Sequence, residues 1–322
     1  MQLNPQLRLI LETKRPTNNP QQNLAFITGL LKQQGASYVV DAFNNVTVDL
    51  GGVTCFTSHT DTVDNKLGTN TLNIDTKGII TVKGGGVLGA DCGSGMYIML
   101  RMIAAQVQGL YVFFATEEMG RIGSSAYTMP DHIKHCVSFD RKGTDNLITY
   151  QMGELGCSDA FADAFIAAFD LPYKKDPTGS FTDSYSFFGK VSECINLSVG
   201  YYDQHSKNER QDLPFLEKLV DACIAMDWAA LPAERDPTAD PTADPVYEDD
   251  NWGVKYYNKA NYKFSPSWRN DAYEIEDFVY ENTWIVAELL REYGITRADL
   301  DAYKAEYDSY VGDDDDGPAD TK

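Results

Sequence analysis

The sequence has little positive charge and no long apolar run. Its 322 residues include 27 lysines and arginines against 48 acidic residues, which gives a formal net charge of -21. No basic stripe interleaved with aromatic residues offsets this charge, so nucleic acid is excluded as a partner. The apolar runs, such as residues 96–105, are too short and interrupted to span a bilayer, and no basic segment followed by an apolar stretch opens the chain. Membrane insertion and secretion are therefore not expected.

Cysteine and histidine are also scarce. The six cysteines are scattered without the short paired spacing of a zinc ribbon or a disulfide framework, which favours a reducing compartment and a cytoplasmic location. Only four histidines occur in the chain. Residues 84–95 are rich in glycine, but they lack the Gly-Lys-Ser/Thr and Gly-x-Gly-x-x-Gly signatures, so nucleotide binding is excluded.

The acidic residues are concentrated at the end of the chain, where residues 231–322 hold 23 acidic and 9 basic side chains. A proline- and aspartate-rich direct repeat at 236–245 opposes both helix and sheet and reads as a stiff linker. We therefore expect a catalytic domain at 1–230, a linker at 231–250, a helical hairpin at 251–311 and a disordered acidic tail at 312–322. The hairpin is expected to dock on the catalytic domain or on a sister subunit, which would form a homo-oligomer.

Within residues 1–230, apolar runs alternate with helical patterns, and the composition is 43% hydrophobic, enough for a real core. The predicted helices lie within 5–34 on both sides of Pro16 and at 93–106, 123–127, 158–169, 183–188 and 213–228. The predicted strands lie at 37–40, 46–50, 53–58, 110–115, 136–139 and 194–199, with a hairpin joining 71–74 to 79–82. Because several strands are apolar on both faces, we predict an α/β fold with a central mixed, mostly parallel sheet flanked by helices.

Imidazole and carboxylate side chains follow apolar runs at what we predict to be strand ends; they are His59, Asp91, Glu118, Asp140 and His205. Ligands of such sheets lie beyond the carboxyl ends of the strands, so these side chains are expected at one rim. Histidine nitrogen and carboxylate oxygen suit zinc. Two histidines and three carboxylates suffice for two divalent metal ions if one carboxylate bridges them.

Two further carboxylates are free for other roles. Asp61 is placed two residues after His59, where it can accept the second N–H of the imidazole and fix its tautomer. Glu117 precedes Glu118 on a segment that we expect to be extended, so that the two side chains point in different directions. Glu117 is therefore predicted to be the general base, and Glu117 and Asp61 are the predicted catalytic residues.

Five motifs occur in an order that resembles the co-catalytic dizinc peptidase superfamily of aminopeptidases and carboxypeptidases. They are His-Thr-Asp-Thr-Val at 59–63, Gly-Ala-Asp-x-Gly-Ser-Gly at 89–95, Thr-Glu-Glu-x-Gly at 116–120, Phe-Asp at 139–140 and Gly-Tyr-Tyr-Asp-Gln-His-Ser-x-x-Glu at 200–209. The resemblance covers residues 5–228 and implies a zinc peptidase-like fold. It also implies His59 and Asp140 on one zinc ion, Glu118 and His205 on the other, Asp91 as the bridge and Glu117 as the base.

The chain departs from this family at two points. Cys92 stands where members usually have a second aspartate, often joined to the bridging one through a cis peptide bond. Only 65 positions separate Asp140 from His205, too few for the lid domain of the carboxypeptidase-like branch, so the layout resembles the aminopeptidase branch. The segment Thr182-Asp183-Ser184 resembles the family's segment near the substrate pocket.

Other candidates carry less specific patterns. Arg141 suits either a clamp for a substrate carboxylate or an ordinary ion pair. His132 and His135 have a metal-binding spacing, but a surface turn after Pro130 is favoured. Cys92 is interpreted as a small buried neighbour of Asp91.

The sequence thus predicts a zinc-dependent hydrolase that cleaves peptide or related amide bonds with a metal-bound hydroxide. The alternatives are a deacylase of N-acyl amino acids, which uses the same metal chemistry, and a non-catalytic binding or assembly module on the same fold. The complete set of metal ligands together with Glu117 counts against the non-catalytic module, because a site without catalytic function would be expected to lack at least one of these residues. The expected partner is a peptide or small amide substrate.

Overall fold

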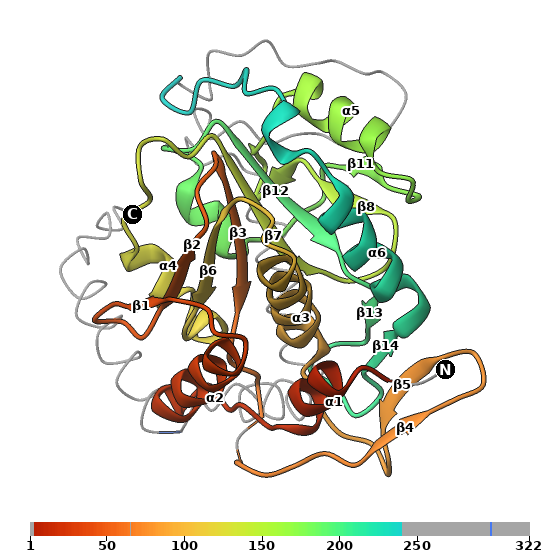
Figure 1. Ribbon diagram of the computed structural model, residues 1–322. Helices are drawn as coiled ribbons and strands as arrows, with labels where there is room; N and C mark the ends of the chain where they lie inside the picture. The colour runs from red at the N-terminus through yellow and green to blue at the C-terminus, as the bar shows by residue number, and fades with distance from the viewer. Residues whose placement is uncertain (1–2, 65, 240–296, 298–322) are drawn as a thin grey trace, which may run out of the picture. The chain divides into compact units, whose positions relative to one another are not determined.

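The computed structural model describes residues 3–64, 66–239 and Arg297 (Figure 1). The chain divides into two units, Met1–Tyr256 and Tyr257–Lys322, and nearly all the described residues belong to the first. The predicted hairpin at 251–311, the acidic tail at 312–322 and the linker beyond residue 239 lie outside the described residues.

An eight-stranded sheet forms the centre of the first unit, with the strand order β1-β2-β6-β3-β7-β12-β8-β11. In that order the strands are Val39–Val40, Val46–Asp49, Leu110–Phe114, Thr54–His59, His135–Arg141, Glu193–Ser198, Asn146–Ile148 and Lys174–Asp176. The strand pairs β6–β3, β3–β7, β7–β12 and β8–β11 are parallel, and the remaining pairs are antiparallel. The predicted mixed, mostly parallel sheet is confirmed.

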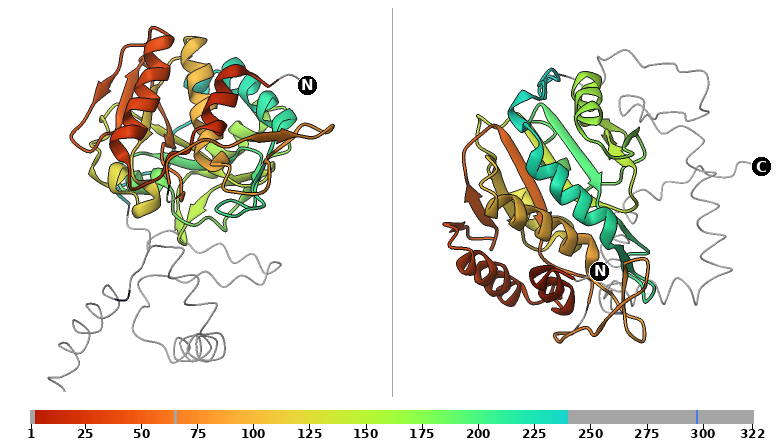
Figure 2. Two further views of the ribbon diagram at one scale, coloured as in Figure 1. Left: turned by 90° about the horizontal axis from the view of Figure 1, so that it is seen from below. Right: turned by 45° about the vertical axis from the view of Figure 1, so that its right-hand side comes forward.

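Helices cover both faces of this sheet. The α-helices are α1 Pro5–Glu12, α2 Pro20–Gln33, α3 Ala90–Ala104, α4 Ile122–Ala126, α5 Asp159–Ala168 and α6 Leu213–Ala225, and the 3-10 helices are η1 Glu117–Met119, η2 Asp183–Phe187 and η3 Trp228–Ala230. Figures 1 and 2 show α3 and α6 side by side across one face. The short helix η2 packs on the other face, against β3, β7 and β12. Among the described residues, no helix is both long enough and apolar enough to cross a membrane.

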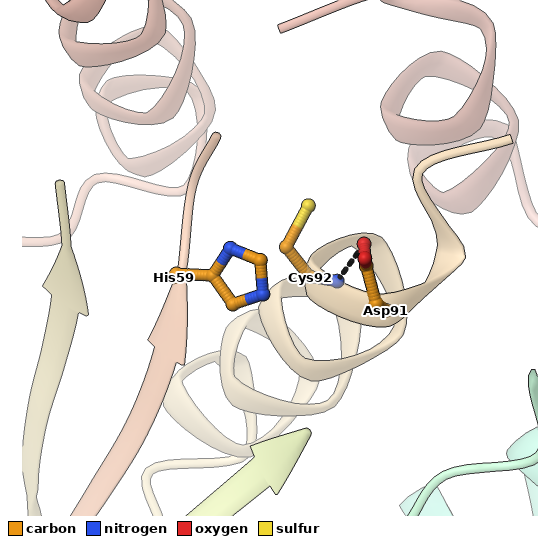
Figure 3. A group of neighbouring side chains, drawn as sticks. All are labelled: His59, Asp91 and Cys92. Atoms are coloured by element: carbon orange, nitrogen blue, oxygen red, sulfur yellow. Dashed lines mark hydrogen bonds between the residues drawn. The ribbon is translucent and has the colours of Figure 1, made fainter. Parts of the chain in front are cut away.

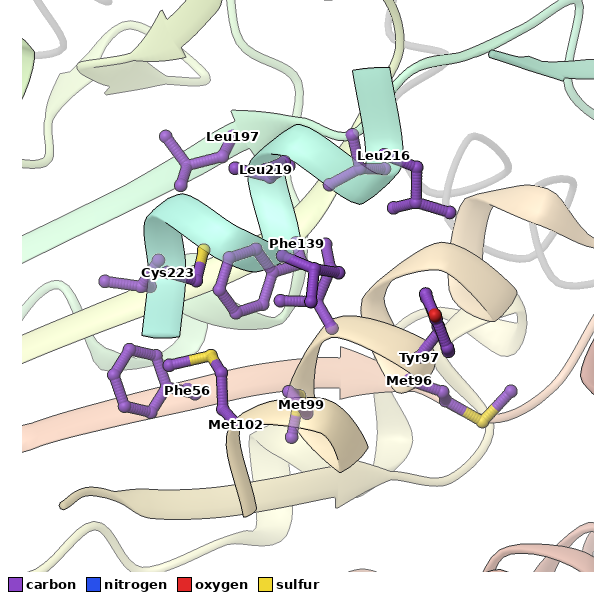
Figure 4. Close-up of a cluster of buried hydrophobic side chains, with 14 of the residues drawn as sticks. Phe56, Met96, Tyr97, Met99, Met102, Phe139, Leu197, Leu216, Leu219 and Cys223 are labelled. Carbon is purple, nitrogen blue, oxygen red and sulfur yellow. The ribbon is translucent and has the colours of Figure 1, made fainter. Parts of the chain in front are cut away.

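Neighbouring residues of the central strands belong to different apolar clusters, because successive side chains of a strand point to opposite faces. Phe56 and Val137 join the larger cluster under α3 and α6, shown in part in Figure 4. Cys55 and Cys136, one position earlier in each strand, join a smaller cluster with Phe187 on η2. The sheet is thus buried on both sides, as the apolar runs predicted. All six cysteines are buried and unpaired.

A smaller sheet with the order β13-β14-β5-β4 lies beside the main one; its strands are Tyr201–Tyr202, Arg210–Asp212, Ile79–Val82 and Leu72–Ile74. The predicted hairpin is confirmed as β4 and β5. A further two-stranded ribbon pairs β9, Tyr150–Gln151, with β10, Glu154–Leu155. The pairing of β14 with β5 brings the segment after His205 to the segment before Asp91.

The surface turn predicted after Pro130 is wrong for His135, which is fully buried at the start of β7. Its ring lies 3.0 Å from the Thr54 hydroxyl and 3.1 Å from the carbonyl oxygen of Pro232. Burial lowers the pKa of His135 to about 4, although the hydrogen bond with Pro232 opposes this shift. The ring is therefore neutral in the folded protein at neutral pH.

This buried histidine predicts a loss of stability in mild acid. An unfolded histidine takes up its proton near pH 6.5, whereas the folded one does so near pH 4, so the unfolded state binds more protons between these values. Stability is expected to fall as the pH falls from about 6.5 to about 4, by up to ~3 kcal/mol from this group. Denaturant unfolding of the wild type and of His135→Gln across this range should give a smaller pH slope in the variant. Equal slopes would contradict the assignment of a neutral buried ring.

Candidate metal centre

His59 and Asp140 are brought together by the register of two parallel strands. Because Thr57 is paired with Ser138, the residues two positions later, His59 on β3 and Asp140 on β7, are also neighbours. The His59 Nε2 atom lies 3.6 Å from Asp140 Oδ1. The Thr182 hydroxyl donates a hydrogen bond of 2.5 Å to the other oxygen of Asp140, which fixes the direction of this carboxylate.

Asp91 reaches the same place from a helix. The expectation that Asp91 stands at the end of a strand is wrong, because α3 begins at Ala90, earlier than the predicted residue 93, and Asp91 lies in its first turn. Gly89 precedes the helix in a left-handed conformation with φ of 65°. The backbone N–H of Cys92 donates to Asp91 Oδ1 at 2.7 Å, and the Asp91–Cys92 peptide bond is trans.

Glu117 and Glu118 follow β6 on the 3-10 helix η1, and the expectation of an extended segment is wrong. Thr116, with φ of 57°, makes the turn from the strand into this helix. The Asp61 carboxylate accepts hydrogen bonds from the backbone N–H groups of Glu117 and Glu118, at 3.1 and 3.4 Å. Adjacent residues of a 3-10 helix also point in different directions, so different roles for the two glutamates remain compatible with the structure.

Asp61 therefore supports the centre differently from the prediction. The His59 Nδ1 atom lies 3.0 Å from the backbone carbonyl oxygen of Asp61 and 3.6 Å from its carboxylate. The carbonyl, rather than the carboxylate, is the hydrogen-bond acceptor that fixes the tautomer of His59. The carboxylate instead holds η1 in place, so that Asp61 supports both His59 and the two glutamates.

His205 completes the arrangement from the loop that follows β13. Its Nε2 atom lies 2.9 Å from Asp91 Oδ2 and 2.9 Å from Glu118 Oε1. The backbone at His205 has φ of 61°, in the left-handed region that is uncommon for residues other than glycine. From this backbone conformation the imidazole faces both carboxylates.

Asp91 connects the two halves of the centre. Its carboxylate forms one group with Glu118 and His205 and a second group with His59 and Cys92; the ligand atoms within each group lie within 4.8 Å of one another. Figure 3 shows the second group, with Asp91 and Cys92 in the first turn of α3 beside the end of β3. The Asp91 carboxylate therefore lies within reach of both halves of the centre.

The centre stabilises positive charge. Burial lowers the pKa of His205, but the hydrogen bond with Asp91 and the adjacent Glu118 carboxylate outweigh burial and raise this pKa to about 11. Burial raises the pKa of Asp91, yet the hydrogen bond with His205 and the charge of His59 bring it below its usual range. The buried Glu118 Oε1 atom has the imidazole of His205 as its polar neighbour, with Nε2 at 2.9 Å. The residues present therefore fit a divalent metal site.

The structure also shows the contacts of Arg141 and Cys92, the two remaining candidates near the centre. Arg141 forms an ion pair with Asp176 at 3.3 Å, which favours the ordinary ion pair over a clamp for a substrate carboxylate. Cys92 is fully buried, as predicted, and its sulfur lies 3.2 Å from the guanidinium of Arg15. Burial raises the pKa of Cys92 to about 12.

Two buried acids near the centre, Glu209 and Asp183, were not among the predicted catalytic or metal-binding residues. The Glu209 carboxylate accepts hydrogen bonds from the backbone N–H groups of residues 88, 89 and 90, and so anchors the start of α3. Burial and the charge of Asp91 raise the pKa of Glu209 to about 8, against the effect of these donors. Asp183 is buried, its Oδ1 atom accepts no hydrogen bond among the described residues, and burial raises its pKa to about 7. Glu209 and Asp183 both lie in segments that resemble the peptidase superfamily, and this resemblance was the sequence signal that could have identified them.

Comparisons with solved structures identify the fold. Aminopeptidase PepT from Bacillus cereus superposes with a TM-score of 0.56 at 14% identity, over 68% of this chain and 95% of that one. Pyrococcus horikoshii TET1 peptidase gives 0.54 at 16% identity, over 69% and 98%. A tripeptidase from Staphylococcus aureus gives 0.54 at 14% identity, over 68% and 95%.

The predicted zinc peptidase-like fold is confirmed by these superpositions. No protein-family model matches the sequence, and no curated protein matches it either.

Proposed function

We propose that the protein is a metal-dependent hydrolase of peptide or related amide bonds with an aminopeptidase-like preference. The observation that carries this proposal is the position of Asp91 between His59 and His205. The fold shared with peptidases supports it. His59 and Asp140 would hold one divalent ion, Glu118 and His205 a second, and Asp91 both; zinc is the metal that this set of donors favours.

Bound ions would polarise the scissile carbonyl group and lower the pKa of water at the centre. The chain's own contribution is to place a proton acceptor beside them. The Glu117 carboxylate makes no hydrogen bond or ion pair within the described residues, and its backbone is held by Asp61. Burial raises the pKa of Glu117 well above its ordinary value, which suits a general base that must later release the proton to the leaving amine.

The aminopeptidase-like preference follows from the segment between Asp140 and His205. This segment forms α5, η2 and strands of all three sheets, so it builds the domain itself and contains no inserted lid. The carboxylates around the centre attract a substrate ammonium group, whereas a blocked amine lacks this charge.

We therefore expect faster cleavage of a peptide with a free amine than of its N-acetylated counterpart. The measurement is kcat/KM for leucyl-alanine and N-acetyl-leucyl-alanine, with zinc content determined by mass spectrometry. Faster cleavage of the acetylated substrate would favour the N-acyl amino acid deacylase. No hydrolysis of either, or of a wider amide panel, by the metal-loaded protein would favour the binding module. A cytoplasmic location and homo-oligomer formation stay predictions.

A further inference from the structure

Arg15 is a buried cation that has no carboxylate partner within the described residues. Its side chain is 1% exposed, although a buried charge is costly unless an opposite charge balances it. The guanidinium donates to four backbone carbonyl groups, among them those of Thr60 at 3.1 Å and Gly89 at 3.2 Å. Its Nη2 atom also lies 3.2 Å from the Cys92 sulfur, the one side-chain atom among its described acceptors.

These contacts connect Arg15 with the two elements that meet at the candidate centre. Thr60 directly follows His59 at the end of β3, and Cys92 lies in the first turn of α3. The sulfur of a neutral thiol is only a weak hydrogen-bond acceptor. A sulfur with negative charge, in contrast, would supply the opposite charge that Arg15 lacks.

The Cys92 sulfur also lies among metal-binding atoms (Figure 3). One ligand atom of each of His59, Asp91 and Cys92 lies within 4.8 Å of the other two, and all three residues are buried. The centre of such a triangle is at most about 2.8 Å from each atom, close to the ~2.0 to 2.3 Å bonds that zinc forms with nitrogen, oxygen and sulfur. Among the described residues, Cys92 is the one cysteine that belongs to such a group.

We propose that Cys92 is a thiolate ligand of the ion that His59, Asp91 and Asp140 hold. When the ion binds, the S–H bond is replaced by a sulfur–metal bond and the proton passes to the solvent. The thiolate then lies between two cations, the metal ion and the guanidinium of Arg15. The inference rests on the proposed function, because it assumes the metal centre, and it adds a difference between the two ions.

With Cys92, the ion at His59 has four protein ligands, which is the closed arrangement of a structural zinc site. The ion at Glu118 and His205 has three, with Asp91, and keeps a position open for water. The exposure of the two imidazoles agrees with this difference, since the His59 side chain is 2% exposed and that of His205 is 35% exposed. We therefore expect the ion at His59 to bind first and more tightly.

Cobalt(II) reports a sulfur ligand directly, because a thiolate bound to this ion gives an intense near-ultraviolet charge-transfer band that nitrogen and oxygen ligands do not give. The metal-free full-length protein is titrated with cobalt(II) and its absorption is recorded. The wild type should develop the band with the first equivalent, and the second should add little to it. Cys92→Ala should lose the band.

Cys223→Ala is the matched control, since it makes the same change at another buried cysteine, on α6. This variant should keep the band. In Cys92→Ala the Kd for cadmium should rise by about 10-fold or more, and the Kd for manganese should change less, because soft sulfur favours cadmium.

Hydrolysis of leucyl-alanine by the zinc-loaded wild type separates this inference from the proposed function. A band that depends on Cys92, in a protein that hydrolyses no amide, supports the inference while the peptidase proposal fails. Hydrolysis by a wild type that shows no band overturns the inference and leaves the peptidase proposal standing. A band that survives in Cys92→Ala, or that appears only with the second equivalent, also overturns it. Because the wild-type spectrum alone can give this result, the test does not depend on the folding of a variant.

Discussion

Glu117→Gln is expected to lower kcat by about 100- to 10,000-fold, the range over which general acid–base assistance usually contributes. The amide keeps the size and the hydrogen-bonding capacity of the side chain but cannot take up a proton. Because the Glu117 backbone N–H, and not its side chain, is bonded to Asp61, the substitution leaves η1 anchored. Zinc content and melting temperature should therefore stay near those of the wild type.

Glu118→Gln is the matched control, since it makes the same chemical change one residue later. Glu118 Oε1 lies 2.9 Å from His205 Nε2 and is assigned as a ligand, so this variant should lose metal affinity together with activity. The measurements are metal content after dialysis and kcat on the best substrate, for both variants at saturating zinc. Near-normal turnover in Glu117→Gln would rule out its role as the base. Equal loss of metal in both variants would mean that the two glutamates do not have separate roles.

Asp91→Ala is expected to reduce the metal content from about two ions to less than one per chain, because a bridging carboxylate serves both ions. The structural basis is that Asp91 is grouped both with His59 and with Glu118 and His205. His205→Ala, in contrast, should mainly weaken one ion and leave the site of His59 and Asp140 in place. Titration with zinc, followed by mass spectrometry of the metal-loaded protein, measures both outcomes.

Asp91→Asn shows whether the loss arises from the missing charge or from a disturbed helix. Its amide oxygen can still accept the hydrogen bond that the Cys92 N–H gives to Asp91 Oδ1, so α3 should begin normally. We expect Asp91→Asn to lose metal nearly as strongly as Asp91→Ala, with unfolding behaviour close to that of the wild type. Retention of two ions by either variant would overturn the bridging assignment, whatever the effect on activity.

The sequence predicted the large elements because their patterns are local. The apolar runs of β3, β6, β7 and β12 are long enough to be recognised as buried strands, and the helical spacing of α2, α5 and α6 is regular. The short strands β11 and β14 were missed. Their residues, Lys174–Asp176 and Arg210–Asp212, are mostly charged, and they pair because tertiary structure places them beside β8 and β5. The helical turn predicted at 183–188 is a 3-10 helix, a distinction that depends on its packing against the sheet.

The side-chain types and the order of the five motifs by themselves indicated the chemistry that we propose, because imidazole and carboxylate groups that gather in one place suit a cation. Tertiary structure decided how each group reaches that site. The start of α3 presents Asp91 because Glu209, more than a hundred residues later, anchors the preceding turn. Tertiary structure also decided which charged side chains are paired. An ion pair depends on the distance between two side chains in the folded protein, and the number of residues between them in the sequence does not reveal that distance. For that reason Arg141 is paired with Asp176 and Arg15 has no carboxylate partner within the described residues, a difference that no local pattern encodes.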